Sequence, residues 1–331
     1  MKENRTLPYL AGIGYSVIFG FSFLFTKIGL THMSEMQVIA FRFLVAAFVL
    51  ELLKALKVIN PKFKGKNMKF VLITAIFQPV LYFFFEVRGV NLSLSSEAGL
   101  MMSLVPVLTA VGASIFLKEK LRTVQVFFIL LSVGGVVFIN VMKEDLATSG
   151  NLLGIFYLSL AILAGTMYGL FSKKSSGEFK PMDITYIMMW FGAIAFNAIV
   201  IIDSLIKGDL SNYFRPLQNV EALISILYLG ILSSVVAFFF MNYTISRIPV
   251  SQSAILTNLV TVFAILAGVF ILDEPFGWKD LIGSIMILIG VFGTMHFREK
   301  KTNHNSQNTN HNENAIDNSQ IPIKRLENKN S

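Results

Sequence analysis

The sequence contains no cysteine among its 331 residues. Disulfide bonds, thiolate metal sites and cysteine nucleophiles are therefore excluded. Only four histidines are present, and two of them, His304 and His311, lie in a polar stretch near the C-terminus. A histidine-built metal centre is disfavoured as well, so we expect neither a metal nor a cofactor.

Charged residues are also scarce, since Asp, Glu, Lys and Arg make up 15% of the chain while hydrophobic residues make up 54%. A soluble domain carries roughly a quarter charged residues. This deficit and the mean hydropathy of +0.65 indicate a membrane protein. The net charge is +8. The basic residues lie between apolar blocks rather than in a basic domain, so we expect no nucleic-acid partner.

Long apolar segments take up most of the sequence. A helix needs about 20 mostly apolar residues to cross the hydrocarbon core of a lipid bilayer. Segments of this kind predict an all-α integral membrane protein with ten transmembrane helices. Their ranges are 8–29, 35–55, 69–88, 95–117, 122–142, 151–172, 182–206, 221–244, 250–272 and 278–297.

Lysine and arginine residues are distributed unevenly among the connections between these segments. If the N-terminus is cytoplasmic, most of them fall on the cytoplasmic side, including Lys54, Lys57, Lys62, Lys64, Lys66 and Lys69. Because cytoplasmic loops carry an excess of Lys and Arg, this distribution predicts that both termini are cytoplasmic. The Lys- and Asn-rich composition without cysteine is typical of a bacterial chain, which places the expected protein in the plasma membrane.

The last thirty residues, 302–331, differ from the rest of the chain. They are polar, rich in asparagine and without an apolar period. A segment of this composition cannot bury a core. It predicts a disordered cytoplasmic tail.

The chain repeats itself internally. At an offset of 155, residues 96–121 align without gaps with 251–276, and at an offset of 145 Gly20 aligns with Gly165. Two halves result, 8–142 and 151–297, each with five predicted spans. Because five is odd, the second half is expected to enter the membrane from the opposite side. The loops support this inversion, because Lys118, Lys120 and Arg122 correspond to a loop that carries Asp273 and Asp280.

Inverted repeats have a mechanical consequence. Two related halves of opposite topology can exchange conformations around a site near the middle of the membrane, which is the basis of alternating access. The pattern therefore favours a solute transporter. A duplication retained only for packing is the alternative reading.

Several motifs resemble those of a known family. The first half contains S-E-A-G-L-x-x-S-L-x-P-V-L-T-A from Ser96, Phe-Leu-x-Glu ending at Glu119, and Phe-Arg-Phe-Leu from Phe41. The second half contains Asn258-x-x-Thr261 and Phe270-x-x-Asp273-Glu274. Together they resemble the EamA-type transporters of the drug/metabolite transporter superfamily over about residues 8–297. The second half departs from the first in having Thr261 where the first has Pro106.

The resemblance implies secondary transport of a small organic metabolite, often an amino acid or related solute and often outward. An uncoupled uniporter or channel-like permease is the main alternative. An integral-membrane enzyme is less favoured, because paired acids, histidine or a nucleophile in a cavity are scarce in this sequence. A sensor is disfavoured too, because the tail is short and featureless.

Small and polar residues on three predicted helices are the candidate substrate-binding residues. They are Ser103 and Pro106 on the fourth helix, Asn258 and Thr261 on the ninth, and Gln78 and Tyr82 on the third, which Pro79 is expected to interrupt. Lipid cannot satisfy their polar atoms or the carbonyl that Pro106 frees near Met102, so a cavity is one explanation. Close helix packing bridged by Ser and Asn is the other.

Ionisable residues within the predicted spans form a second group. Arg42, Glu86 and Glu97 all fall in the outer half of the first four helices. A charge at this depth needs a partner or water. We expect them to act in gating or in coupling transport to a proton gradient, with ordinary ion pairs as the alternative. Their counterparts in the second half are uncharged.

Overall fold

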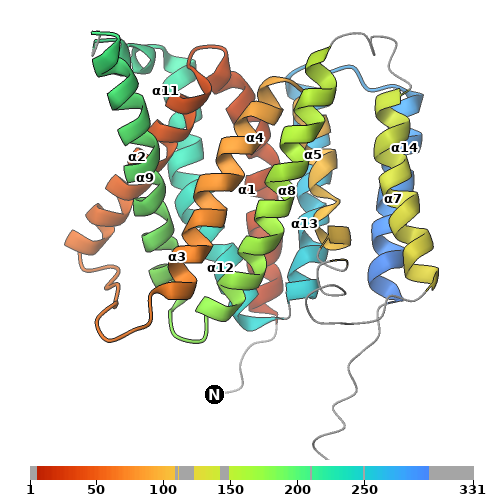
Figure 1. Ribbon diagram of the computed structural model, residues 1–331, viewed down its shortest axis with the longest axis horizontal. Helices are drawn as coiled ribbons and strands as arrows, with labels where there is room; N and C mark the ends of the chain where they lie inside the picture. Colours follow the sequence, from red (N-terminus) through yellow and green to blue (C-terminus); the bar gives the residue numbers. More distant parts are fainter. Residues whose placement is uncertain are drawn as a thin grey trace, which may run out of the picture. The chain divides into compact units, whose positions relative to one another are not determined.

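The computed structural model describes residues 6–108, 111, 123–141, 149–208, 211–248 and 250–297, and every regular element in these ranges is helical (Figure 1). Six helical stretches among them are long and apolar enough to cross a membrane. They are Leu7–Leu30, Glu35–Ala55, Lys69–Asn91, Leu152–Ser175, Pro181–Ile206 and Val220–Arg247. Shorter apolar helices occupy Ser95–Leu108, Thr123–Gly135 and Leu256–Ile271.

The elements follow the order of the predicted segments. The first half contains α1 (Leu7–Leu30), α2 (Glu35–Ala55), a span made of α3 (Lys69–Ala75), η1 (Ile76–Leu81) and α4 (Tyr82–Asn91), then α5 (Ser95–Met102) and α7 (Thr123–Val141). The second half contains α8 (Ser149–Ser175), α9 (Pro181–Ile206), the short α10 (Ser211–Phe214) and η2 (Arg215–Gln218), a span made of α11 (Val220–Leu227), η3 (Tyr228–Ala237) and α12 (Phe238–Arg247), then α13 (Val250–Ile271) and α14 (Trp278–His296). The ten-span count and the orientation stay predictions, and the predicted tail, 302–331, lies outside the described residues.

Local sequence explains where several helices begin. Ser34 forms a capping box with Gln37 at the start of α2, with Gln37 N donating to Ser34 Oγ over 3.3 Å and Ser34 N donating to Gln37 Oε1 over 3.0 Å. Asn219 accepts from two amides in the first turn of α11. These bonds satisfy N–H groups that have no partner within the helix.

Two of the spans depart from α-helical geometry in the middle. In η1 the backbone of Gln78 is extended (φ −147°, ψ 114°), and Pro79 follows it without an amide hydrogen. The span of the second half contains a π-helix, η3, at Tyr228–Ala237. An offset of 155 carries 76–81 onto 231–236, which lies within η3. Pro79 predicted the first of these departures, whereas η3 contains no proline and was not predicted from the sequence.

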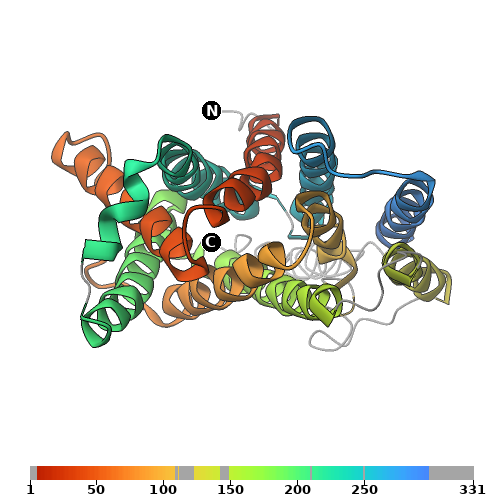
Figure 2. The ribbon, with the colours of Figure 1, turned by 90° about the horizontal axis from the view of Figure 1, so that it is seen from above.

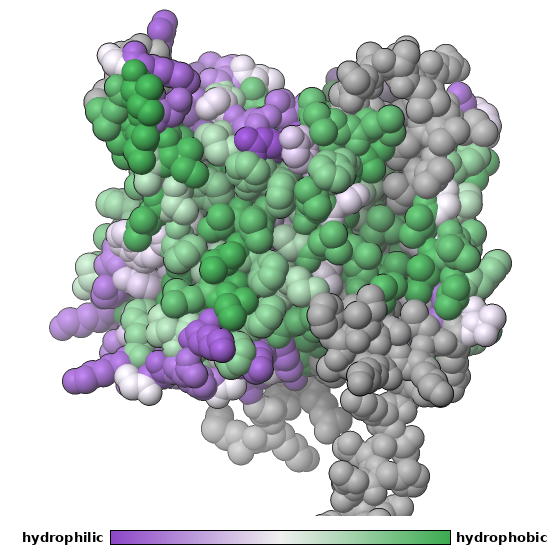
Figure 3. All heavy atoms as spheres, viewed as in Figure 1, coloured by the Kyte–Doolittle hydropathy of each residue, from purple (hydrophilic) through white to green (hydrophobic). Residues whose placement is uncertain are grey.

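The helices pack in pairs drawn from the two halves. The main contacts are α1 with α13, α2 with α9, α5 with α13, α4 with α8, and α7 with α14. Figure 2 shows α7 and α14 side by side at one end of the bundle. On the face in Figure 3, hydrophobic residues cover the middle and hydrophilic residues gather along the upper and lower margins at the left.

Glycines allow α7 and α14 to approach closely. A Cβ added to Gly135 would lie 2.7 Å from the carbonyl oxygen of Gly283, and one added to Gly290 would lie 2.6 Å from the carbonyl oxygen of Phe128. Neither position tolerates a side chain without a shift of the backbone. The two contacts exchange under the offset of 155, since Phe128 corresponds to Gly283 and Gly135 to Gly290.

Candidate functional site

A small cavity of about 50 Å³ lies among helices of both halves. The spans around η1 and η3 each contribute to its wall, together with α1, α2, α5, α8 and α13. Its lining residues are Tyr15, Phe19, Ser22, Phe23, Arg42, Gln78, Tyr82, Phe83, Glu86, Met102, Val105, Gly165, Met241, Thr257 and Val260.

Arg42 places a guanidinium group in this cavity. The residue is only 2% exposed. Its Nε donates to Ser234 Oγ over 2.8 Å and its Nη2 to Ser233 Oγ over 2.6 Å, both in η3. The guanidinium carbon also lies 4.1 Å from the centre of the Phe83 ring. Hydroxyls and an aromatic face orient the cation without neutralising it.

Glu86 places a carboxylate at the same cavity. It lies on α4 and is 3% exposed. Among the described residues, no hydrogen bond or ion pair within 4.0 Å is found for its carboxylate. Opposite charges therefore line one apolar cavity without forming a direct pair. Buried charges need partners, so this arrangement leaves binding capacity for a solute or for water.

Gln78 and Tyr82 also belong to the polar part of the wall. The Oε1 atom of Gln78 is buried without a hydrogen-bond partner among the described residues. The Tyr82 hydroxyl donates to Met102 Sδ over 3.4 Å, which is a weak interaction. The extended backbone at Gln78 interrupts the regular helical geometry of this span. The structure thus brings Arg42, Glu86, Gln78 and Tyr82 together.

The candidates on the fourth and ninth helices do not line this cavity, although their neighbours Met102 and Thr257 do. Thr261 Oγ1 donates to the carbonyl oxygen of Gly99 over 2.8 Å, which bridges α13 and α5. Ser103 Oγ donates to the Leu100 carbonyl over 2.6 Å. Pro106 follows the turn that ends α5 at Met102. Asn258 differs from these, because its buried Oδ1 has no partner among the described residues.

Glu97 belongs to the start of α5 rather than to the cavity wall. Its Oε2 accepts from the Leu94 amide over 3.1 Å, as a carboxylate in the first turn of a helix commonly does. The structure therefore separates Glu97 from Arg42 and Glu86, which the sequence analysis had grouped with it.

The two serines that bind Arg42 were not predicted by residue spacing along an α-helix. Ser233 and Ser234, which hold Arg42, sit inside an apolar run and fall in the π-helical segment η3. The offset of 155 pairs them with Gln78 and Pro79, and this relation is the one signal that points to them.

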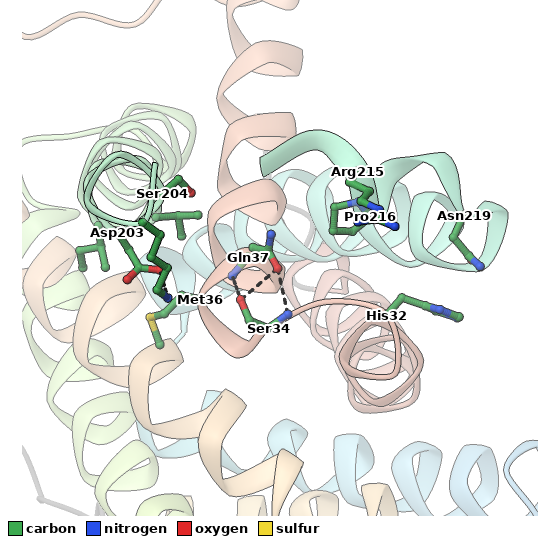
Figure 4. Close-up of a pocket in the computed structure, with 12 residues that line it drawn as sticks. His32, Ser34, Met36, Gln37, Asp203, Ser204, Arg215, Pro216 and Asn219 are labelled. Carbon is green, nitrogen blue, oxygen red and sulfur yellow. Dashed lines mark hydrogen bonds and ion pairs between the residues drawn. The ribbon is translucent and has the colours of Figure 1, made fainter. Parts of the chain in front are cut away.

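A larger cavity of about 810 Å³ lies at one end of the bundle, around the ends of α1 and α9, the start of α2, and η2 (Figure 4). Its polar groups are mostly paired with one another or with neighbours. Asp203 accepts from Lys207 over 2.7 Å, and His32 lies 2.9 Å from Glu221. Ser34 is held by the capping box. Among the described residues, none that lines this cavity has a buried side-chain N or O atom without a hydrogen-bond partner, unlike Gln78 in the central one.

Comparisons with known proteins agree with this architecture. The model of the EamA-like transporter family matches residues 6–141 and again 152–295. The uncharacterized transporter YcxC of Bacillus subtilis (strain 168) is 36% identical over 302 residues, covering 91% of this chain and 97% of YcxC. A protein of Salmonella typhimurium (strain LT2) named as a probable amino-acid metabolite efflux pump is 24% identical over 294 residues, covering 86% of this chain and 94% of its own length.

A solved structure supports the fold alone. A crystal structure with 17% sequence identity superposes with a TM-score of 0.62, covering 87% of this chain and 97% of the other. Together with the apolar helices, the family match indicates a multi-pass membrane protein. This chain is a member of the EamA-like transporter family.

Proposed function

We propose that the protein is a secondary transporter that exports a small zwitterionic metabolite, an amino acid or a close relative, by alternating access. The observation that carries this proposal is the central cavity, where buried Arg42 and buried Glu86 face one space without a direct ion pair. The name of the Salmonella typhimurium relative, a probable amino-acid metabolite efflux pump, supports the proposed solute class and direction.

The chemistry of the wall suits a solute with both charges. Arg42 presents donors that match a carboxylate, while the two serines and Phe83 keep its plane fixed. The Glu86 carboxylate accepts hydrogen bonds from an ammonium group. Gln78 offers an unpaired amide oxygen to the same solute. Asn258, whose Oδ1 is also unpaired, is proposed as a second contact, with Ser103, Pro106 and Thr261 shaping the path between α5 and α13.

The arrangement of the helices supports an inverted repeat. The two ranges matched by the family model, 6–141 and 152–295, each hold one half. The contacts Gly135–Gly283 and Phe128–Gly290 exchange under the offset of 155, as a twofold relation between the halves requires. We propose ten spans in two five-helix repeats of opposite orientation, with both termini in the cytoplasm of a bacterial cell.

The size of the cavity supports a closed state. A volume of about 50 Å³ holds a few waters at most, whereas small-molecule sites measure about 300–1,000 Å³. A metabolite enters only if the halves move apart at one end. Alternating access supplies that movement, and we propose that the π-helical segments η1 and η3 are the flexible parts of the wall.

Transport in proteoliposomes tests this proposal. Arg42→Gln and Glu86→Gln each remove one charged hydrogen-bond partner, worth about 1.5–3 kcal/mol, so KM for a labelled amino acid should rise about tenfold to a hundredfold. Arg215→Gln and Glu221→Gln are matched controls, because both residues are exposed and lie outside the central cavity. Unchanged KM in both cavity variants, with normal incorporation, contradicts the site.

We also propose that Glu86 couples transport to the proton gradient, because it is a buried carboxylate without a fixed partner. A protonophore should collapse accumulation of the solute by the parent protein, and Glu86→Gln should remove that sensitivity. If the protonophore does not change solute accumulation by the parent protein, the result favours the alternative, an uncoupled uniporter or channel-like permease.

A further inference from the structure

Two lysines near the C-terminal ends of α1 and α8 make the same unusual contact. Lys27 Nζ donates to the carbonyl oxygens of Val90, Asn91 and Ser93 over 2.9, 3.5 and 2.5 Å. These carbonyls lie at the end of α4 and in the connection to α5. The Lys27 side chain thus extends away from α1 and binds the C-terminal end of another helix.

Lys173 repeats this contact in the second half. Its Nζ donates to the carbonyl oxygens of Ile245, Ser246 and Ile248 over 2.7, 3.3 and 3.0 Å, at the end of α12. The three acceptors of Lys27, shifted by 155, are these three residues. The lysines themselves are 146 residues apart, whereas the first helices of the two halves align at an offset of 145. The gapless alignment therefore pairs Lys27 with Ser172 and does not reveal that Lys27 and Lys173 correspond.

The physical basis of the contact is the end of a helix. The last carbonyls of an α-helix have no partner within the helix and carry partial negative charge. An ammonium group has three donors and suits three such oxygens. Because both lysines find their acceptors on a neighbouring helix, each one ties the first helix of its half to the third.

The two contacts lie at opposite ends of the bundle. In Figure 1 the chain rises along α1 and descends along α8, so their C-terminal ends are at the top and the bottom. Lys27 therefore fixes the connection between α4 and α5 at one end. Lys173 fixes the connection between α12 and α13 at the other.

A carboxylate strengthens the first contact. Glu274, which follows α13, accepts from the amides of Ser95 and Ser96 over 2.6 and 2.9 Å and from Ser96 Oγ over 2.6 Å. The connection between α4 and α5 is thus held by a cation at its carbonyl end and by an anion at its amide end. Movement of this connection away from α1 and α13 breaks both.

We propose that Lys27 and Lys173 are paired latches that keep the two ends of the solute path closed, and that opening at one end releases one lysine while the other stays bound. This inference rests on the alternating access proposed above. Both latches are formed in this structure, in agreement with a central cavity too small for a metabolite. The latches are positioning residues, since neither lines the cavity.

The absence of native cysteine makes a direct test simple. Ser22→Cys places a single thiol at the cavity, where Ser22 is 5% exposed and its hydroxyl donates to the Phe19 carbonyl of its own helix. A membrane-impermeant maleimide is added to right-side-out and to inside-out vesicles that contain this reporter protein. The ratio of the two labelling rates reports which end opens more often.

Removing one latch should shift that ratio, and removing the other should shift it the opposite way. Lys27→Met should favour labelling from its own end by about tenfold, which corresponds to about 1.4 kcal/mol. Lys173→Met should favour the other end to a similar degree. The double variant should return the ratio to near that of the parent. Lys27→Arg and Lys173→Arg, which keep the cation, should shift the ratio less.

The outcomes separate this inference from the proposed function. Single variants that shift the ratio in the same direction, or not at all, overturn the latches while leaving transport intact as a proposal. If a methionine variant does not fold, Lys27→Gln or Lys173→Gln, which also removes the cation, replaces it in the same ratio test. A reporter that is labelled from neither side in the parent removes the cavity from the solute path, and with it the proposed function.

Discussion

Asn242 lies at the centre of a buried hydrogen-bond network that joins α8, α9 and α12. Its Oδ1 accepts from the Tyr168 hydroxyl over 2.9 Å and from Ser172 Oγ over 2.8 Å, and its Nδ2 donates to Thr185 Oγ1 over 3.0 Å. All four side chains are fully buried. The network connects the span that carries Ser233 and Ser234 to its neighbours, so it supports the wall that orients Arg42.

Asn242→Leu keeps the size of the side chain and removes these three bonds, together with a weak bond from Nδ2 to Met188 Sδ over 3.8 Å. Side-chain hydrogen bonds between membrane helices average about 0.6 kcal/mol and reach about 1.7 kcal/mol. Three of them give an expected loss of about 2 kcal/mol in the free energy of unfolding, with about 5 kcal/mol as the upper bound. The large end of this range applies if the hydroxyls left behind find no other acceptor.

Unfolding by a denaturing detergent, followed by circular dichroism, measures this loss. Tyr168→Phe removes one bond, and a double-mutant cycle with Asn242→Leu isolates the coupling between the two residues, expected at about 0.6 kcal/mol. Asn197→Leu is not a suitable control, because Asn197 is itself bonded to Tyr213 and to the Ala40 carbonyl. A loss below about 0.5 kcal/mol for Asn242→Leu would refute the network as a source of stability.

Two further predictions concern helix packing and the α5 terminus. Gly135→Ala should lower the melting temperature, because its Cβ would lie 2.7 Å from the Gly283 carbonyl oxygen, whereas Gly134→Ala, whose Cβ would lie 3.9 Å from the nearest atom, should not. Overpacking of this kind costs about 1–3 kcal/mol. Glu274→Gln should raise maleimide labelling of the Ser22→Cys reporter from the end that Lys27 closes, because the amide group loses the charge that binds Ser95 and Ser96. Equal melting temperatures of the two glycine variants, or an unchanged labelling ratio, would contradict these expectations.

The sequence predicted the helical segments well, because each needs a long apolar run that nothing else in the chain resembles. It also predicted the break at Pro79, since proline removes an amide donor. Arg42, Glu86, Gln78 and Tyr82 were named as candidates because ionisable or polar residues inside an apolar span are costly and need a reason. The structure places all four on one cavity.

Other features could not be predicted for identifiable physical reasons. Ser and Thr hydroxyls often bond to a backbone carbonyl, so their type alone does not separate a cavity from a helix contact; Ser103 and Thr261 bond to backbone in this way. The π-helical turns of η3 change which residues share a face, so Ser233 and Ser234 escaped a search at α-helical spacing. Lys173 was missed because it lies one residue after Ser172, which is the position that aligns with Lys27.

The two halves share their backbone devices and differ in their charges. Three backbone features recur at related positions of the two halves. They are the lysine contacts, the π-helical segments η1 and η3, and the glycine contacts of α7 and α14. The cavity charges do not, because Arg42 corresponds to Ile187 and Glu86 corresponds to Met241, which lines the same cavity. Under the alternating access that we propose, a symmetric frame lets the two ends exchange their conformations at similar free energy. For the coupled export that we propose, an asymmetric pair of charges gives the solute, or a proton on Glu86, different surroundings as each end opens, and this difference is the proposed basis of transport in one direction.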